Sequence, residues 1–570
     1  MAVDQLRMIL ILTLGVLAFL LWDAWERDYG PRAGAGSAPS QQASPSAGGA
    51  GFAETESDIP SAPPALPSAE GDIPSPADEI SAISSSTAET AAPKIKVITD
   101  VLAVEIDTRG GTIDHLELTG YPVAVDRPDE AYRLLADRDP DRYFTVRSGM
   151  ARAQGADPNQ RLPTSNTVFE ADRSLYELAP EAQVLEVPLR WRSPDGVEYL
   201  RTYRFERNAY TIEMHTRVSN TGNAPWKAAL YAQMQRTPPS GGGGLFGTYT
   251  YTGGVLSGPQ DPYEKVDFSD MGRDNLERDV AGGWAAMIEH YFTVALVPGA
   301  QDTNRYYSRQ LAGGKFALGV VGPSRSIDPG QSETFSLTLY AGPKIQDRME
   351  SLAENLNLTV DYGFLSIIAE PLFWLLRWIH TYIGNWGFSI IALTCLIKLA
   401  FFHLSATSYR SMARMRKLQP RITALRDRYS GDRQRMNQEM MNLYRQEKIN
   451  PLGGCFPILV QIPVFIALYW VLLESVELRQ APFIGWLVDL SEYDPYFVLP
   501  ILMGLTMLIQ QRLNPSPPDP IQAKIMMALP FVFTFFFLFF PSGLVLYWFV
   551  NNVLSIIQQW VITKKIVGTT

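Results

Sequence analysis

Cysteine is nearly absent from this chain, because only Cys395 and Cys455 occur among its 570 residues. A disulfide framework is therefore excluded. Histidine is also rare, and the five that occur are scattered without the spacing of a metal-ligand pair: His115, His215, His290, His380 and His403. We therefore expect neither a metal site nor a cofactor.

Recognisable catalytic motifs are missing too. The glycine run 241–244 is not followed by Lys-Ser/Thr, which indicates a flexible loop rather than a phosphate-binding one, and no Gly-x-Ser-x-Gly occurs. Glu289 and His290 are adjacent and could form an acid–base pair, but neighbours within a strand point to opposite faces, so we do not expect one. The net charge of −10 and the pI near 5.2 argue against a chain built to bind nucleic acid. We predict a protein that is not an enzyme and that does not bind nucleic acid sequence-specifically.

Charge is divided unevenly along the chain. From Pro371 onward there are 18 basic and 10 acidic residues, whereas the part before it has 31 basic and 49 acidic ones. The mean hydropathy of −0.04 thus averages an acidic, polar first part and a basic, apolar second part. Such a division is typical of a membrane protein with domains on both sides of a bilayer.

The first 94 residues combine an apolar run with a polar tether. Residues 8–22 carry no charge, and no small-x-small cleavage site follows them closely. We predict an uncleaved signal-anchor helix at 1–25, with a cleaved signal peptide as the alternative. Residues 26–94 are rich in Ala, Ser, Pro and Gly and have too little apolar surface to fold, which predicts a disordered linker.

Short strand-like segments fill residues 95–345. Residues 199–206 alternate between apolar and polar side chains, which is the pattern of a half-buried strand. Turn signals such as Arg-Gly-Gly-Thr at 109–112 and Ser-Pro-Asp-Gly at 193–196 separate the segments, and no helical pattern comes between them. We predict a large antiparallel all-β sandwich.

Residues 346–385 are predicted to connect this sandwich to the membrane. Within them, residues 364–383 place apolar side chains at helical spacing, with Trp374, Trp378 and Tyr382 at the edges of the apolar face. This pattern predicts an amphipathic helix in the plane of the membrane interface. A core helix of the sandwich is the alternative.

The rest of the chain contains five apolar runs of 16 to 20 residues, at 386–403, 455–473, 496–511, 525–540 and 544–563. Each is close to the ~20 residues that cross a bilayer, so together with the N-terminal run we predict six transmembrane helices. The loop 404–454 has eleven basic and four acidic residues, whereas 474–495 has one and five. The positive-inside rule then places both termini in the cytoplasm and the β-domain on the other side.

Lys398 is the only formally charged residue in these five runs. A charge at the centre of a membrane helix costs about 2.5–3.5 kcal/mol, so it usually faces a polar cavity. The alternative is that the long side chain reaches the headgroups, because Lys398 lies five residues before His403, or ~7.5 Å along a helix. Thr394 lies one turn earlier on the same helical face and tips the balance towards a cavity.

Further polar residues in these runs are expected to line a wet groove with Lys398: Gln461, Gln510, Asn551, Asn552 and Ser555. Taken singly, each is more often a hydrogen-bonding contact between helices. None of the five runs contains an acidic residue, which argues against a proton-coupled transporter.

The basic loop at 404–454 is predicted to form a helical hairpin whose first arm is interrupted by Pro420. Methionines recur at helical spacing in both arms, and Arg416 lies beside them: Met412, Met415, Met436 and Met440. The simple interpretation is two helices that pack these stripes together. A functional interpretation adds that flexible methionines accept varied apolar peptides.

Four segments of the second half closely resemble the YidC/Oxa/Alb family of membrane protein insertases: residues 384–391 (GNWGFSII), 412–420 (MARMRKLQP), 450–457 (NPLGGCFP) and 540–548 (FPSGLVLYW). Two segments of the first half, 107–111 (DTRGG) and 282–287 (GGWAAM), resemble the periplasmic domain of the Gram-negative YidC form. The resemblance therefore reaches nearly the whole chain.

The resemblance implies an inner-membrane protein with a periplasmic β-supersandwich and a five-helix core, here 386–563, around a hydrophilic groove. Lys398 occupies the position where the family usually has arginine, so the charge is kept and the planar, bidentate fork is lost. Trp548, in the last of the four segments, is expected to contact the substrate at the groove. The segment after the core, 564–570, forms a short cytoplasmic tail.

The partners that the resemblance implies are nascent membrane proteins, the lipid bilayer, the ribosome and the Sec translocon, and the chain is expected to insert its substrates and to help them fold. Because the tail has only Lys564 and Lys565, contact with the ribosome would depend on the hairpin. Two alternatives remain: a small-solute transporter, and an envelope sugar-binding protein that acts through the β-domain.

Overall fold

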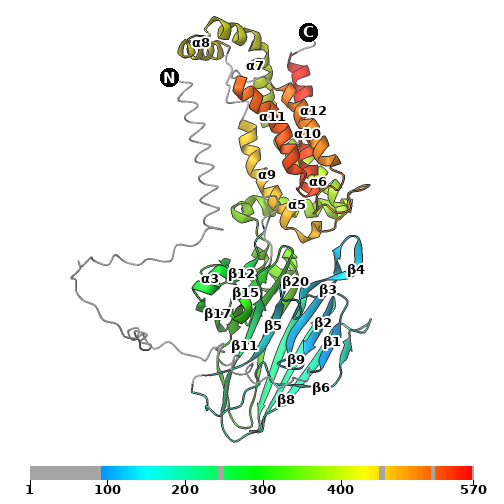
Figure 1. Ribbon diagram of the computed structural model, residues 1–570, viewed down its shortest axis with the longest axis vertical. Helices are drawn as coiled ribbons and strands as arrows, with labels where there is room; N and C mark the ends of the chain where they lie inside the picture. Colours follow the sequence, from blue (N-terminus) through cyan, green and yellow to red (C-terminus); the bar gives the residue numbers. More distant parts are fainter. Residues whose placement is uncertain are drawn as a thin grey trace, which may run out of the picture. The chain divides into compact units, whose positions relative to one another are not determined.

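The computed structural model describes residues 92–153, 155–239, 250–429, 431–447, 456–514 and 520–567. The predicted signal-anchor at 1–25 and nearly all of the predicted linker at 26–94 lie outside these residues. The described part consists of a β-rich region followed by a group of helices (Figure 1).

The β-rich region contains two large sheets, as the strand pattern predicts. In the described residues the first sheet has eleven strands, in the order β14-β17-β18-β11-β5-β3-β2-β1-β7, with β4 beside β3 and β19 beside β11. Their bounds are β1 Lys94–Ile98, β2 Leu102–Asp107, β3 Thr112–Ala124, β4 Arg127–Leu135, β5 Phe144–Arg152, β7 Leu175–Glu177, β11 Trp226–Arg236, β14 Glu277–Ala281, β17 Thr303–Leu311, β18 Lys315–Val321 and β19 Arg325–Ile327.

The second sheet has nine described strands in the order β13-β12-β15-β16-β20-β10-β9-β8-β6. Their bounds are β6 Glu170–Ala171, β8 Val184–Arg192, β9 Val197–Glu206, β10 Thr211–Asn220, β12 Gly253–Ser257, β13 Glu264–Val266, β15 Trp284–Ile288, β16 Phe292–Pro298 and β20 Ser332–Pro343. Among the described strand pairs, only β1 with β7 is parallel.

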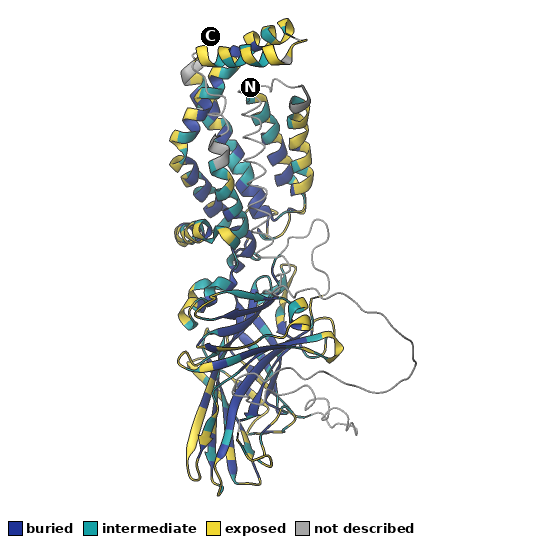
Figure 2. Cartoon of the chain, turned by 90° about the vertical axis from the view of Figure 1, so that its left-hand side faces the viewer, coloured by how far each residue is buried: buried dark blue, intermediate teal, exposed yellow. Residues whose placement is uncertain are grey.

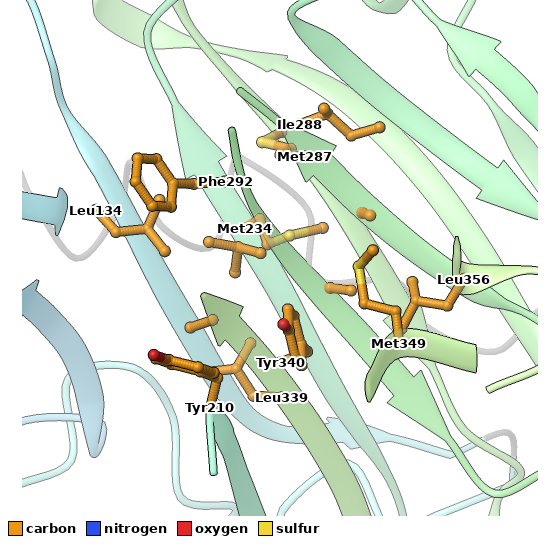
Figure 3. Close-up of a cluster of buried hydrophobic side chains, with 14 of the residues drawn as sticks. Leu134, Tyr210, Met234, Met287, Ile288, Phe292, Leu339, Tyr340, Met349 and Leu356 are labelled. Carbon is orange, nitrogen blue, oxygen red and sulfur yellow. The ribbon is translucent and has the colours of Figure 1, made fainter. Parts of the chain in front are cut away.

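Apolar side chains from both sheets meet to form the core of this domain. Met234 on β11 belongs to the first sheet, and Phe292 on β16 and Leu339 on β20 belong to the second (Figure 3). Burial differs among the strands: β11 is buried over nearly its whole length, whereas β4 and β14 are mostly exposed, and both dark blue and yellow strands are visible in Figure 2. Two sheets that bury their facing sides in this way form a sandwich.

Alternation in β9 places one polar side chain in the core. The buried positions are 197, 199, 201, 203 and 205, so Arg201 points inward while the apolar Leu200 points outward. The Arg201 guanidinium donates to the Ser148 hydroxyl at 2.8 Å and to the Tyr199 hydroxyl, and it lies over the Tyr199 ring. A buried charge is tolerated only when such partners surround it.

Two glycines in the turn before β3 have conformations that other residues rarely adopt. Gly110 and Gly111 have φ of +72° and +63°. A Cβ on Gly111 would lie 2.8 Å from the Tyr203 hydroxyl, so both the backbone and the core exclude a side chain there.

The helices are concentrated in the second half of the chain. Their bounds are α3 Phe268–Arg273, α4 Gln346–Leu352, α5 Ser366–Ile383, α6 Trp386–Ala400, α7 Phe402–Arg428, α8 Arg433–Gln446, α9 Phe456–Glu474, α10 Val498–Leu513, α11 Pro520–Phe537 and α12 Ser542–Val567, with 3₁₀ turns η1 Ala312–Gly314, η2 Leu356–Thr359, η3 Gly363–Leu365 and η5 Val476–Leu478.

By length and composition, one described helix is long and apolar enough to cross a membrane by itself, over Ser542–Lys564 in α12. A second candidate is the pair α6 and α7, which is bent by 67°. Shorter apolar helices occur at Val460–Glu474, Val498–Leu513 and Ala523–Phe537. The five predicted runs therefore all become helices, but the count of six spans stays a prediction.

Helix α5 packs against α6 and α9, not within the sandwich, so the core-helix alternative is wrong. Its buried residues are Ala369, Phe373, Leu376 and Ile379, which follow helical spacing. Trp374 is 66% and Tyr382 74% exposed, so this helix presents an aromatic, uncovered face. An amphipathic helix with exposed aromatic rings suits a membrane interface.

Helix α7 continues through Pro420 to Arg428, so the predicted interruption of the first hairpin arm is wrong. The break in the chain comes earlier instead, at Phe401, between α6 and α7. The loop expected to begin at residue 404 is thus already helical from Phe402 onward. The first turns of α7 therefore lie next to the end of α6.

The C-terminal end of α9 contacts the β-domain through a buried ion pair. The Lys344 ammonium, directly after β20, lies 3.0 Å from the Glu474 carboxylate, and the two side chains are 1% and 4% exposed. The Nε2 atom of His290, between β15 and β16, lies 2.9 Å from the Leu473 carbonyl oxygen. Because a carbonyl only accepts hydrogen bonds, this nitrogen carries a proton.

Glu289 and His290, considered as an acid–base pair, lie in the turn between β15 and β16, and not inside a strand. Their partners differ. The Glu289 carboxylate binds the Arg236 guanidinium at 2.7 Å and accepts a hydrogen bond from the Tyr132 hydroxyl at 2.5 Å, whereas His290 binds the Leu473 carbonyl oxygen. This places the two side chains in separate contacts.

Replacing Lys344 with Met should lower the free energy of unfolding by about 3–5 kcal/mol, because it leaves the Glu474 carboxylate buried and unpaired. Thermal unfolding of the full-length protein in detergent measures the loss. The matched control is Arg377→Met, which breaks the more exposed pair with Asp347 and should cost less than about 1 kcal/mol. Equal losses in both variants would contradict the prediction.

Stability should also depend on the protonation of His290. Burial, helped by the positive charge of Lys344, lowers the pKa of His290 to about 3. An unfolded histidine titrates near pH 6.5, so the stabilisation is complete above that pH and is lost as the pH falls towards 3. His290→Gln removes the titration, so the melting temperature of the wild type should fall more between pH 7 and pH 5 than that of the variant. Parallel pH profiles would refute a lowered pKa.

Candidate functional site

A cavity of about 220 Å³ lies among the helices of the second half. Its described lining comes from α6, α7, α9, α12 and the end of α10. The lining residues are Lys398, Ser405, Ser408, Tyr409, Met412, Gln461, Ile462, Phe465, Gln510, Asn514, Trp548, Asn551 and Ser555. The cavity thus brings together most of the polar residues that the sequence places in apolar runs.

Lys398 lies in the wall of this cavity between α6 and α12. Its side chain is only 6% exposed, and its ammonium donates to the Ser555 hydroxyl at 2.7 Å. The Ser555 hydroxyl in turn donates to the Asn551 carbonyl oxygen, one turn earlier in α12, at 2.7 Å. Within the described residues no carboxylate forms an ion pair with Lys398. The ammonium therefore lies in the wall of the cavity with a hydrogen-bonding partner but without a neutralising one in that part of the chain.

A second polar contact crosses the cavity from α9 to α12. The side-chain amide of Gln461 donates to the Asn551 side-chain oxygen at 2.6 Å. Gln461 lies among apolar residues of α9, and its partner lies four residues before Ser555. Lys398, Ser555, Asn551 and Gln461 therefore form one continuous polar line across three helices.

Aromatic side chains form the apolar part of the wall. The rings of Phe465 and Trp548 meet edge to face with centroids 4.4 Å apart, and Phe537 packs on Trp548 at 5.1 Å. Edge-to-face pairs at this spacing are favourable and hold the rings in place. The cavity thus has one polar side and one aromatic side.

Two predicted residues lie outside the lining. Thr394 is 1% exposed, and its hydroxyl donates to the Ile390 carbonyl of its own helix at 2.6 Å. Asn552 is 5% exposed and donates towards the Thr506 hydroxyl of α10 at 3.4 Å. Both are contacts within or between helices, which is the ordinary role of isolated polar residues in apolar helices.

Helix α7 contributes residues to the cavity that the sequence did not predict. Ser405, Ser408 and Tyr409 line the cavity, together with Met412. Their spacing of three, four and seven residues is a helical stripe and could have been found, but the segment was assigned to a cytoplasmic loop. The bend at Phe401 is what turns this stripe towards α9 and α12.

The hairpin residues divide between two small clusters. Met412 packs with Ala406, Tyr409 and Ile562, which joins α7 to α12. Met415 and Met440 pack around Leu418 and Ile422, and so join α7 to α8.

Neither cluster contains Met436, which is half-buried. Arg416 is exposed. The simple interpretation, two helices that pack their stripes together, describes Met415 and Met440.

Two family models match the chain in succession. The model described as the YidC periplasmic domain matches residues 94–375, and the one described as 60Kd inner membrane protein matches residues 378–569. Together they cover both the sandwich and the helices that line the cavity.

Relatives are similar over the full length. A protein of Nitrosococcus oceani named membrane protein insertase YidC is 48% identical over 563 residues, which is 99% of each chain. Proteins with the same name from Thioalkalivibrio sulfidiphilus and Methylococcus capsulatus are each 47% identical, over 99% and 100% of this chain and 99% of their own. On this evidence, the chain belongs to the YidC family of membrane protein insertases.

Proposed function

We propose that the cavity receives the polar end of a nascent membrane protein while the adjoining apolar segment moves into the lipid. The observation that carries this proposal is the buried ammonium of Lys398, which is held by Ser555 and has no carboxylate partner among the described residues. A charge in this setting attracts acidic and polar peptide groups more strongly than it would in water. The chain acts in this proposal without a catalytic step.

The polar line replaces part of the hydration shell that a peptide loses on leaving water. Lys398 donates hydrogen bonds, and the Asn551 and Gln461 amides can donate and accept them. An unsatisfied backbone group in hydrocarbon costs several kcal/mol, so each such partner lowers the barrier to entry.

The driving force in this proposal comes from the substrate itself. An apolar segment of about 20 residues gains free energy as it leaves water for lipid, so no nucleotide is needed. Helix α11 presents a broad apolar surface for this passage, with Phe531, Val532 and Phe535 each more than half exposed. We propose that the apolar segment of the substrate moves along this surface into the lipid.

The remaining assignments are proposals as well. We place both termini in the cytoplasm and the β-domain in the periplasm, because the segment that contains α7 and α8 is strongly basic. We assign ribosome contact to the exposed arginines of this hairpin, and we include the Sec translocon among the partners. The proposed domain limits are 1–25, 26–94, 95–345, 346–385, 386–563 and 564–570.

Lys398→Ala should lower the insertion rate of a single-span substrate with a short acidic N-tail about tenfold, which corresponds to the loss of one charge-assisted contact. Lys398→Arg should retain most of the activity, because the positive charge stays. Insertion into vesicles containing the purified protein, followed by protease protection of the tail, measures the rate. Lys524→Ala, which removes an exposed charge from α11, is the matched control. Normal insertion by Lys398→Ala would refute the role of the groove charge.

Asn551→Leu should impair substrates according to the polarity of their tails. The change interrupts the polar line and leaves the Gln461 amide without its 2.6 Å partner. Insertion of a polar-tailed substrate should fall several-fold, whereas the same span with a short apolar tail should insert at nearly the wild-type rate. Equal loss for both substrates would indicate a general packing defect and would contradict the proposed role of the line.

A further inference from the structure

A second cavity, separate from the polar line, lies where the end of α12 meets α7 and the end of α10. Its volume is about 290 Å³, and its described lining includes Met412, Arg416, Leu513, Gln559, Trp560 and Lys564. Two basic residues reach it, and no acidic residue is among its described lining. Its size, at the lower limit of small-molecule pockets, suits a headgroup better than a whole ligand.

The face of α12 beside this cavity changes from apolar to charged along the helix. Ile557, Trp560 and Lys564 are spaced by three and four residues, so they share one face. Ile557 is 51% and Trp560 56% exposed, and the Lys564 ammonium lies 5.0 Å from the centre of the Trp560 ring. The candidate span in α12 ends at Lys564. An apolar residue, an interfacial tryptophan and a basic residue follow the order of acyl chain, interface and phosphate in a lipid.

Gln559, which lines the cavity, has a buried acceptor without a donor. Gln559 is 4% exposed, and its amide nitrogen donates to the Leu513 carbonyl at 3.3 Å and to the Asn514 side-chain oxygen at 3.1 Å. Both partner atoms are oxygens that accept hydrogen bonds, so the amide nitrogen of Gln559 must point towards them and its Oε1 atom away from them. Its Oε1 atom is buried without any hydrogen-bond partner. A hydroxyl donor from a ligand in the cavity would satisfy this acceptor.

We propose that this cavity binds the headgroup of an anionic phospholipid that carries a hydroxyl group, such as phosphatidylglycerol. Arg416 and Lys564 bind the phosphate, a headgroup hydroxyl donates to Gln559 Oε1, and an acyl chain lies along Ile557 and Trp560. Met412 lines both this cavity and the one that contains Lys398. The bound lipid therefore supports the wall that α7 and α12 contribute to the insertion groove.

The test is native mass spectrometry of the full-length, delipidated protein titrated with dioleoyl-phosphatidylglycerol. Arg416→Gln/Lys564→Gln should weaken binding about 10- to 30-fold, as two basic residues near a lipid phosphate predict. Arg414→Gln/Arg426→Gln removes the same charge from exposed positions of α7 that do not line the cavity, and should change binding less than about twofold. Equal effects of the two double variants would overturn the proposal.

Phosphatidylmethanol, an anionic phosphodiester without a headgroup hydroxyl, tests whether the lipid hydroxyl donates to Gln559 Oε1. The wild type should prefer phosphatidylglycerol about fivefold or more, and Gln559→Leu should lose this preference while still preferring anionic lipids to phosphatidylcholine. Absence of the preference in the wild type would overturn the assignment of Gln559.

Two further outcomes distinguish other ligands. Competition by free glycerol phosphate at concentrations comparable to the lipid would show a soluble-anion site and overturn the lipid proposal. A loss of ribosome binding in Arg416→Gln/Lys564→Gln with lipid binding intact would assign the pair to RNA phosphates and overturn it as well. Melting temperatures close to the wild type confirm that the variants are folded.

Discussion

A positive charge that enters an apolar helix bundle must keep hydrogen bonds, and the groove is arranged around this constraint. The Lys398 ammonium depends on Ser555, and Ser555 lies on the same helix as Asn551, which binds Gln461 of α9. Replacing Asn551 would leave the Gln461 amide without its 2.6 Å partner, and replacing Ser555 would leave the Lys398 ammonium without its described partner. The polar line therefore supports the charge, and in the proposed function it is also the surface that a substrate meets.

The same rule explains the buried charges of the sandwich. Arg201 is enclosed by hydroxyl and carbonyl oxygens, and Lys344 is enclosed with Glu474. These charged groups already have partners within the fold, so they are not available to bind a ligand. Lys398 differs because its one described partner is a neutral hydroxyl. A buried charge that is hydrogen-bonded but not neutralised is suited to bind something else.

Periodicity and composition predicted the sandwich, the α5 amphipath and the helices from apolar runs, because burial in these elements follows a simple spacing. Spacing alone could not assign the inward side of β9, where Arg201 is buried and Leu200 is not. In the groove, the sequence predicted Lys398, Gln461, Gln510, Asn551 and Ser555, since polar residues in apolar helices need partners. It did not separate these from Thr394 and Asn552, because a polar group bonded to its own helix or to a neighbouring helix looks the same in sequence. The residues of α7 were missed because nothing local to Phe401 predicts the bend.

That bend also gives α7 the geometry of a lever. At 1.5 Å per residue, its 27 residues extend about 40 Å from a fulcrum at Phe401. Ser405 and Ser408 lie near the fulcrum, whereas Arg428 lies at the far end. A rotation of about 5° would displace the far end by about 3.5 Å, but Ser405 and Ser408 by less than about 1 Å. A movement of the hairpin would thus cause a smaller displacement at the cavity, but with a larger force.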